Sequence, residues 1–287
     1  MTDQSRASGN TRAVTIAVLL GASLMLTMSM GMRQSFGLFV TPITLDIGVS
    51  VADFTFALAV QNIIWGITQP LTGAIADRFG CRALAVLGSL LYAAGLVVTM
   101  MAAGPIALLI GMGLMIGLAM SCVSLSLALA ASAKVVSLAK QSITLGSVSA
   151  LGSIGSFIAA PLAQHLIVIY GWKAAIAGFL GLCVIMLPGA FLIGAGGAST
   201  PRNLHGAADA GLSLKGALAE AAHHGGYITM SVAFFVCGLQ LIFLTTHLPA
   251  YLALCGQSPE LSATALAVIG GFNAIGCYVL GWLGGKL

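Results

Sequence analysis

Eight apolar stretches, each long enough to cross a lipid bilayer, constrain the fold of this chain more than any other feature. They lie at about 13–34, 54–74, 83–102, 105–132, 142–168, 172–194, 227–248 and 261–284. A spanning helix needs roughly 20 mostly apolar residues, because lipid offers no partners to an unpaired backbone. Charged residues make up only 6% of the sequence, against about 25% in soluble domains. We therefore predict an all-α polytopic membrane protein.

The distribution of lysine and arginine predicts the orientation of these spans, because basic residues concentrate on the cytoplasmic side of a membrane. With the N-terminus in the cytoplasm, Lys173 falls outside and Arg33 lies near the outer end of the first span. All other basic residues then fall inside: Arg6, Arg12, Arg78, Arg82, Lys134, Lys140, Arg202, Lys215 and Lys286. We expect a multi-pass protein of the cell (inner) membrane with both termini cytoplasmic.

One long polar link divides the chain. Residues 195–226 connect the sixth and seventh apolar stretches, whereas the other links are short. This predicts an N-terminal six-helix bundle at 1–194, a cytoplasmic central loop at 195–226 and a partial C-terminal bundle at 227–287. Within the loop, residues 213–224 predict a short amphipathic helix.

Two local patterns predict a helix start and a packing face. Ser50 and Asp53 are three residues apart before the second span, as in a capping box. The run from Gly152 to Pro161 contains mostly small residues, which allow helices to approach closely in lipid. We expect a capped second helix and a closely packed fifth helix.

A ten-residue run, Gly73-Ala-Ile-Ala-Asp77-Arg78-Phe79-Gly80-Cys81-Arg82, gathers scarce charges into a predicted tight turn between two spans. It fits the pattern G-x-x-x-D-R-x-G-x-R and resembles the loop between the second and third helices of major facilitator superfamily transporters. The resemblance implies that superfamily's fold: a complete N-terminal six-helix half, followed by the first two helices of the second half.

A degraded second copy of this pattern supports an internal repeat. Gly281 aligns with Gly73 at an offset of 281 − 73 = 208 residues, and Lys286 then aligns with Arg78. Parallel repeats of six helices are the architecture of this superfamily. Eight spans correspond to two thirds of its twelve helices, so we expect a C-terminally truncated product; a genuine eight-helix protein is the alternative.

The run at 73–82, called the signature loop below, has two interpretations. As a conformational switch, Gly73 allows a neighbouring helix to approach closely, and Asp77 pairs with a helix N-terminus or an arginine in one conformation only. Gly80 forms the turn, and Arg78 and Arg82 hold it at the inner face. As a plain anchor, the same arginines only set the orientation.

Arg33 is the main candidate for substrate binding. A charge within the hydrocarbon is costly, so it faces a polar cavity or extends to the interface. The stretch from Gly31 to Phe39 resembles the first helix of the monocarboxylate and oxalate/formate transporter branch, and a basic residue at this place there implies contact with a substrate carboxylate. A guanidinium suits this role because it binds a carboxylate bidentately. An interfacial arginine is the alternative.

Four further polar residues in the spans are substrate-binding candidates: Gln61, Gln240, His247 and Asn273. Gln61 shares a helix face with Trp65, which favours either a cavity lining or an interhelical hydrogen-bond seam. Gln240 and His247 are two helical turns apart in a stretch that resembles the same branch. Near Asn273, Cys277 stands where that branch commonly has an arginine.

These observations favour secondary active transport of a small organic solute, with an organic anion such as a carboxylate as one interpretation, by alternating access. The partners implied are that solute, a coupling ion (a proton or a counter-anion) and the lipid bilayer, but no nucleic acid. The alternatives are efflux of amphipathic compounds and a truncated, non-transporting membrane protein. The sequence contains no nucleotide-binding motif, metal-ligand cluster or nucleophile–base–acid set, so we predict neither an enzyme nor a cofactor.

Overall fold

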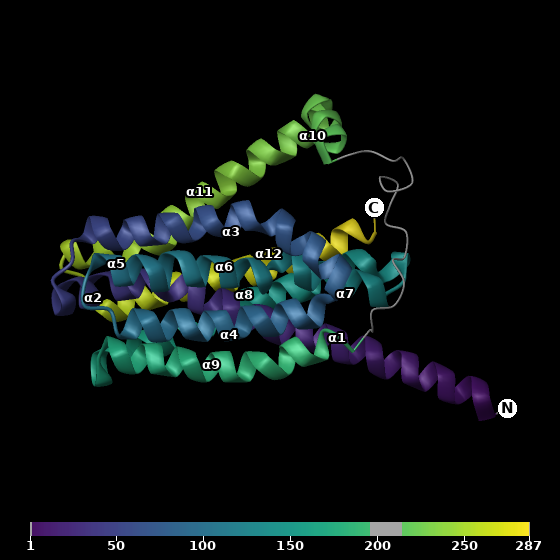
Figure 1. Cartoon of the computed structure of the whole chain (residues 1–287), viewed down its shortest axis with the longest axis horizontal. Coiled ribbons are helices and arrows are strands. Elements are labelled where there is room, and N and C mark those ends of the chain that lie inside the picture. The colour runs from purple at the N-terminus through teal and green to yellow at the C-terminus, as the bar shows by residue number, and fades with distance from the viewer. Residues whose placement is uncertain (1, 196–213, 287) are drawn as a thin grey trace.

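The computed structural model describes residues 2–195 and 214–286, and every element within these ranges is helical (Figure 1). The chain first forms α1 (Thr2–Ser35), η1 (Phe36–Phe39), α2 (Val40–Ile47), α3 (Val51–Phe79), α4 (Cys81–Met100), α5 (Pro105–Leu108), η2 (Leu109–Met115), α6 (Ile116–Cys122) and α7 (Leu125–Val135). It continues with α8 (Leu138–Tyr170), α9 (Trp172–Leu192), α10 (Leu214–His223), α11 (Gly225–Leu254) and α12 (Pro259–Gly284). The short helix predicted at 213–224 is thus confirmed as α10 within the described residues.

Eight segments are long and apolar enough to cross a membrane, as the sequence predicts. The first is longer than expected, because the chain continues beyond Arg33 through the 3-10 turn η1 into α2, giving 37 residues from Thr11 to Ile47. The fourth combines α5, η2, α6 and α7 into one span, Pro105–Val135. The chain therefore folds as an all-α polytopic membrane protein.

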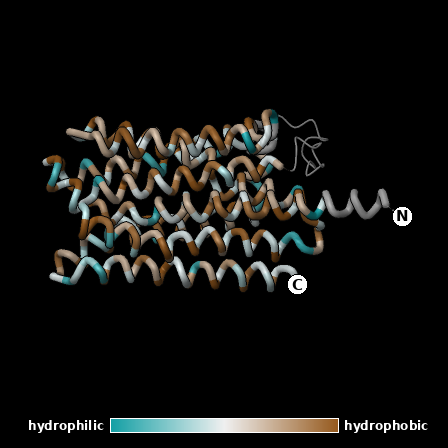
Figure 2. The backbone as a smooth tube through the Cα atoms, turned by 90° about the horizontal axis from the view of Figure 1, so that it is seen from below, coloured by the Kyte–Doolittle hydropathy of each residue, from teal (hydrophilic) through white to brown (hydrophobic). Residues whose placement is uncertain are grey.

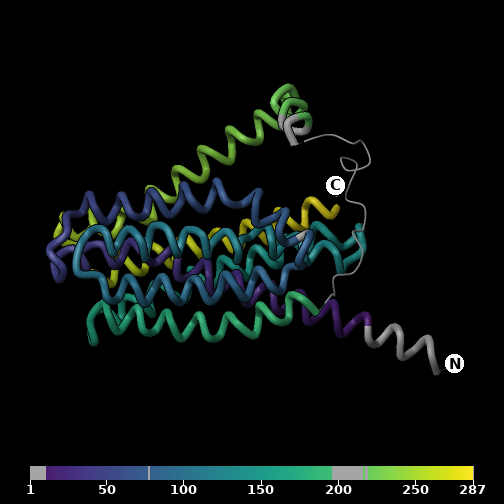
Figure 3. Tube along the Cα trace, in the orientation of Figure 1, coloured from purple at the N-terminus to yellow at the C-terminus, as the bar shows by residue number. Residues whose placement is uncertain are grey.

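The long helices run roughly parallel, and most strongly hydrophilic residues lie near their ends (Figure 2). Both chain termini, α10 and the turn between α3 and α4 lie at one end, called here the N-terminal end (Figures 1 and 3). The loops that follow α2 and α8 lie at the opposite end, called the Asp46 end. The termini thus share one side of the bundle.

Helix α8 lies between α1 and α12 and packs closely against both. A methyl carbon added at Gly155 would overlap the carbonyl oxygen of Thr27 in α1, and one added at Gly281 would lie 2.7 Å from the Cα atom of Gly146. Side-chain hydroxyls reinforce these contacts: Thr27 donates to Leu151 O at 2.9 Å, and Ser142 donates to Gly281 O at 2.9 Å. The small-residue packing face predicted in the fifth span is confirmed.

Single glycines form two of the tight turns. Gly80 is the only residue between α3 and α4, and Gly171 is the only residue between α8 and α9. Their φ angles are +86° and +83°, with ψ values of 153° and 168°, a region of backbone conformation that is essentially restricted to glycine. The tight turn predicted in the signature loop is therefore confirmed.

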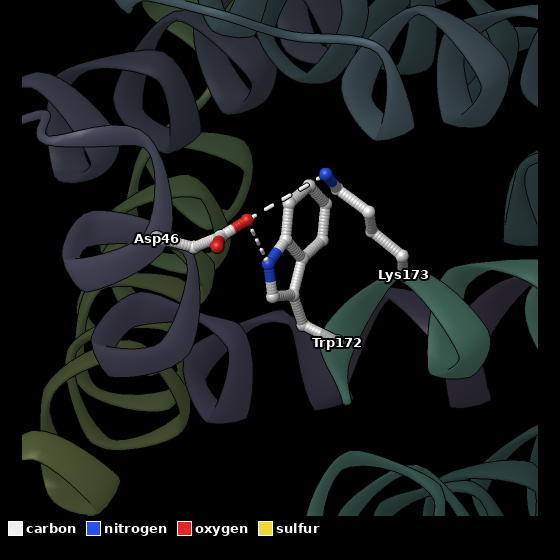
Figure 4. A network of polar contacts seen from close by, with 3 residues as sticks. All are labelled: Asp46, Trp172 and Lys173. Carbon is white, nitrogen blue, oxygen red and sulfur yellow. Dashed lines mark hydrogen bonds and ion pairs between the residues drawn. The ribbon is translucent and has the colours of Figure 1, made fainter. Parts of the chain in front are cut away.

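Polar contacts hold the Asp46 end together. The predicted capping box is present: Ser50 accepts a hydrogen bond from the Asp53 backbone N–H at 3.0 Å, and Asp53 accepts one from the Ser50 backbone N–H at 3.1 Å. Nearby, Asp46 accepts a hydrogen bond from Trp172 Nε1 at 2.9 Å and lies 3.6 Å from Lys173 Nζ (Figure 4). These contacts connect α2 to the start of α9.

Helix α11 contacts the bundle only along part of its length. It packs against η1 and α12, while its first residues, Gly225–Cys237, are exposed throughout. Figure 1 shows it diverging from α3 toward the N-terminal end. The contact of α11 with the first span is therefore concentrated at the Asp46 end.

We expect Gly281→Ala to destabilise the bundle, because the new methyl group overlaps Gly146 across the α8–α12 contact. Overpacking of this kind costs about 1–3 kcal/mol, and each kcal/mol lowers the melting temperature by about 2–4 °C. The control is Gly276→Ala on the same helix, where the methyl group meets no atom within 4 Å and improved helix propensity stabilises by about 0.5–1 kcal/mol. Thermal unfolding in detergent measures both; equal shifts would contradict the packing argument.

Candidate functional site

Arg33 lies in the last turn of α1 and faces neutral partners on α3. Its Nη2 donates a hydrogen bond to Asn62 Oδ1 at 3.1 Å, and its guanidinium carbon lies 4.5 Å from the centre of the Trp65 ring. Asn62 and Trp65 are three residues apart and therefore share one face of α3. Asn62 in turn donates from Nδ2 to Leu58 O at 2.7 Å, which fixes the orientation of its amide. The guanidinium is thus held by an amide oxygen and an aromatic face.

This half-buried cation has no carboxylate partner within 4.0 Å among the described residues. A guanidinium carries five N–H donors, and Arg33 uses one of them in a side-chain hydrogen bond within the described part. A charge at membrane depth is costly unless it is paired or hydrated. The arrangement therefore favours an incoming anion.

Gln61 has a structural role in the seam between α3 and the fourth span. Its side chain is 1% exposed, and its Nε2 donates to Met112 O at 2.9 Å. Met112 lies in η2, a π-helical segment of a kind that occurs frequently at functional sites. Of the two interpretations open from the sequence, the interhelical hydrogen bond is observed. Gln61 also lines the small cavity beside Arg33.

A small cavity separates Arg33 from α11. It is lined by Arg33, Phe36, Gly37, Leu58, Gln61, Asn62, Ile242, Thr245 and Thr246. Its volume of about 20 Å³ is enough for roughly one water molecule and too small for an organic solute. Gly37 lies against the backbone of α11, since a methyl carbon added there would overlap Thr245 O. In this conformation, η1 and α11 are in direct contact beside this cavity.

The other predicted binding residues do not gather around Arg33. Gln240, His247 and Asn273 are exposed, and none lines the cavity. His247 packs beside Phe243 with ring centres 5.1 Å apart, and Asn273 accepts a hydrogen bond from Cys277 Sγ at 3.7 Å. Their role in substrate binding stays a prediction.

Thr245 and Thr246, which line the cavity instead, are not predicted from the sequence, and Asn62 is indicated there only as a polar residue of the second span without a binding role. Thr245 and Thr246 directly precede His247, but the two-turn spacing of Gln240 and His247 selects another face of α11. Asn62 directly follows Gln61, and the four-residue spacing from Gln61 to Trp65 passes over it. The clearest available signal was the polar pair Gln61–Asn62 opposite an intramembrane arginine.

The signature loop comprises the last two turns of α3, Gly80 and the start of α4. Arg82 extends over the Phe191 ring at 4.7 Å and packs against Gly194, so it connects the loop to the end of α9. Arg78 is exposed and lies 5.4 Å from the Phe79 ring centre. The side chain of Asp77 lies outside what the structure describes.

The expectation that Gly73 allows a close helix contact is wrong for this conformation. A methyl carbon added there would meet no atom within 4 Å. Gly73 instead borders a groove of about 350 Å³ between α3 and α7. The groove is also lined by polar side chains, namely Gln69, Thr72, Ser124, Ser126 and Lys134. The absence of a side chain at Gly73 widens this groove rather than tightening a contact.

Comparison with known proteins supports the family suggested by the signature loop. The Major Facilitator Superfamily model matches residues 19–287. The chain is 24% identical over 268 residues to monocarboxylate transporter 13 of Bos taurus, covering 93% of this chain and 61% of that protein. It is 24% identical over 270 residues to the Rattus norvegicus protein of the same name, covering 93% of this chain and 60% of that protein. The chain thus spans about 60% of the length of these relatives. On this match and its eight-span helical fold, the chain belongs to the Major Facilitator Superfamily.

Proposed function

We propose that this chain takes part in secondary active transport of a small organic carboxylate, with Arg33 as its anion-binding group. The observation that carries the proposal is the half-buried Arg33 guanidinium, which has only neutral partners among the described residues. A carboxylate neutralises such a cation and accepts two parallel N–H hydrogen bonds from it. Membership of a transporter family favours this role over an enzymatic one.

The names of the relatives point to the same substrate class. Both are monocarboxylate transporters by name, and the region that matches them includes Arg33. Since the chain spans about 60% of their length, the substrate, the coupling ion and the complete transport cycle all belong to the proposal. We further propose a proton or a counter-anion as the coupling ion.

In a transporter that works by alternating access, the small cavity beside Arg33 would correspond to a conformation that does not admit the solute. Contact between Gly37 and Thr245 leaves about 20 Å³ beside Arg33, so an organic solute does not fit next to the guanidinium in this conformation. Helix α11 leaves the bundle toward the N-terminal end, where its first half is exposed. We infer that movement of α11 relative to η1 opens the path on the Asp46 side.

Replacing Arg33 is expected to abolish specific carboxylate binding. The variant Arg33→Gln loses charge-assisted hydrogen bonds to the ligand, which are worth about 1.5–3 kcal/mol. Its Kd for propionate or succinate should therefore rise about 10- to 100-fold. Arg33→Lys should give an intermediate Kd, because an ammonium group cannot bind bidentately. The fluorescence of Trp65, measured in a Trp172→Phe, Trp282→Phe background, reports binding because its ring lies under the guanidinium.

Two results would contradict the anion site. Arg33→Gln could bind propionate as tightly as the parent chain with unchanged thermal stability, which would make Arg33 interfacial. Alternatively, a lipophilic cation could quench Trp65 while neither carboxylate does, which favours efflux of amphipathic compounds. The neutral analogue propionamide serves as the control for non-specific quenching.

The proposed orientation places the N-terminal end in the cytoplasm of a cell (inner) membrane. With all six cysteines replaced, Val51→Cys at the Asp46 end and Ser137→Cys at the N-terminal end each add one exposed thiol. A membrane-impermeant maleimide should label Val51→Cys in intact spheroplasts and Ser137→Cys only after permeabilisation. The reverse pattern would invert the topology.

We also propose that the signature loop acts as a conformational switch, supported by the contact of Arg82 with α9. Arg82→Lys keeps the charge required of a simple anchor but loses the planar contact with Phe191, worth about 0.5–1 kcal/mol. Hydrogen–deuterium exchange over residues 73–82 should change when propionate binds, and this change should be smaller in Arg82→Lys. If propionate binds without altering exchange in the loop, the anchor interpretation stands.

A further inference from the structure

The indole N–H of Trp65 is a buried donor with no acceptor. Among the described residues, Trp65 Nε1 and Tyr92 Oη are the buried side-chain nitrogen or oxygen atoms that lack a hydrogen-bond partner. Leaving a buried donor unpaired costs about 1–3 kcal/mol, so such groups are rare in native structures. The other two tryptophans differ: Trp172 donates to Asp46, and Trp282 is 42% exposed.

The unpaired Trp65 N–H belongs to a side chain that directly contacts Arg33, the proposed anion-binding residue. Its ring lies under the guanidinium of Arg33, 4.5 Å from Cζ to the ring centre. The amide of Asn62 is already occupied on both sides, since Nδ2 donates to Leu58 O and Oδ1 accepts from Arg33. An indole N–H can only donate, and a guanidinium can only donate. Two neighbouring side chains, Arg33 and Trp65, therefore present N–H donors for which the described residues supply no further acceptor.

We propose that Trp65 is a second anion-binding residue, whose Nε1–H donates a hydrogen bond to the same ligand that Arg33 binds. This inference rests on the proposed function and narrows its substrate class. A pair of donor-only groups favours a ligand group that is negatively charged and accepts several hydrogen bonds, such as a deprotonated carboxylate. A protonated acid or an amide brings its own donors to the site, and an amine cation is repelled by Arg33. The ring has a second role, because its face holds the guanidinium in place.

An NMR experiment on the whole chain tests the hydrogen bond directly. The three tryptophans, labelled with ¹⁵N at the indole nitrogen, give three resonances, and the one missing in Trp65→Phe is assigned to Trp65. Adding propionate should move the Trp65 indole proton downfield, since hydrogen bonding to a carboxylate deshields it. Propionamide should leave it unmoved. The resonances of Trp172 and Trp282 should not shift with either compound.

Binding measurements on matched variants complete the test. Trp65→Phe keeps an aromatic face under Arg33 but loses the donor, so the Kd for propionate measured by calorimetry should rise about 10-fold or more. Trp282→Phe is the matched control, because Trp282 also lies against a cation, Lys286 at 3.9 Å, but at the N-terminal end. Its Kd should equal that of the parent chain. Thermal unfolding of Trp65→Phe, measured alongside, checks that the variant remains folded, because the smaller ring also removes packing against the core.

The outcomes separate this inference from the proposed function. If Arg33→Gln loses propionate binding while Trp65→Phe keeps it and the Trp65 resonance does not move, the anion site stands and the role of Trp65 is refuted. If the parent chain binds neither propionate nor succinate, both proposals are refuted. A downfield shift together with weakened binding in Trp65→Phe establishes the second donor.

Discussion

Backbone-to-backbone packing of α8 against α1 and α12 holds the first and the eighth spans of the bundle together. In lipid there is little hydrophobic gain from burying one apolar helix against another, so association relies on close packing and interhelical hydrogen bonds. The Gly155–Thr27 and Gly281–Gly146 approaches provide that packing, and the hydroxyls of Thr27 and Ser142 add hydrogen bonds across the same contacts. One small-residue helix thereby connects the first span to the last.

This contact also sets the direction of Arg33. Gly31 lies against Gly155 of α8, and a residue two positions later on a helix points to nearly the opposite side. Arg33 therefore faces α3, where Asn62 and Trp65 hold it. The 3-10 turn that follows brings Gly37 against α11 and closes the small cavity. Packing of one face of α1 against α8 thus determines which side chains surround the Arg33 charge on the opposite face.

Several features of the fold are predictable from the sequence because a single local pattern is sufficient for each. The eight spans follow from length and hydropathy, the capping box from Ser50 and Asp53, and the turn at Gly80 from glycine between charged residues. The site is less predictable. Gln61 has the right position on α3 but bonds to Met112, and Gln240, His247 and Asn273 lie away from the Arg33 cavity. The spacing of residues along the sequence predicts which residues share a face of one helix, but it does not predict which neighbouring helix that face contacts.

The class of fold, the eight spans and an arginine within the first span all follow from the amino-acid sequence, because apolar length and charge are properties of single segments. The groups that contact this arginine follow only from how the helices pack. The pairing of Arg33 with Asn62 and Trp65, and the unpaired indole N–H beside it, depend on how α1 and α3 are rotated about their axes. That rotation is set by contacts among residues far apart in the chain, such as Gly31 and Gly155.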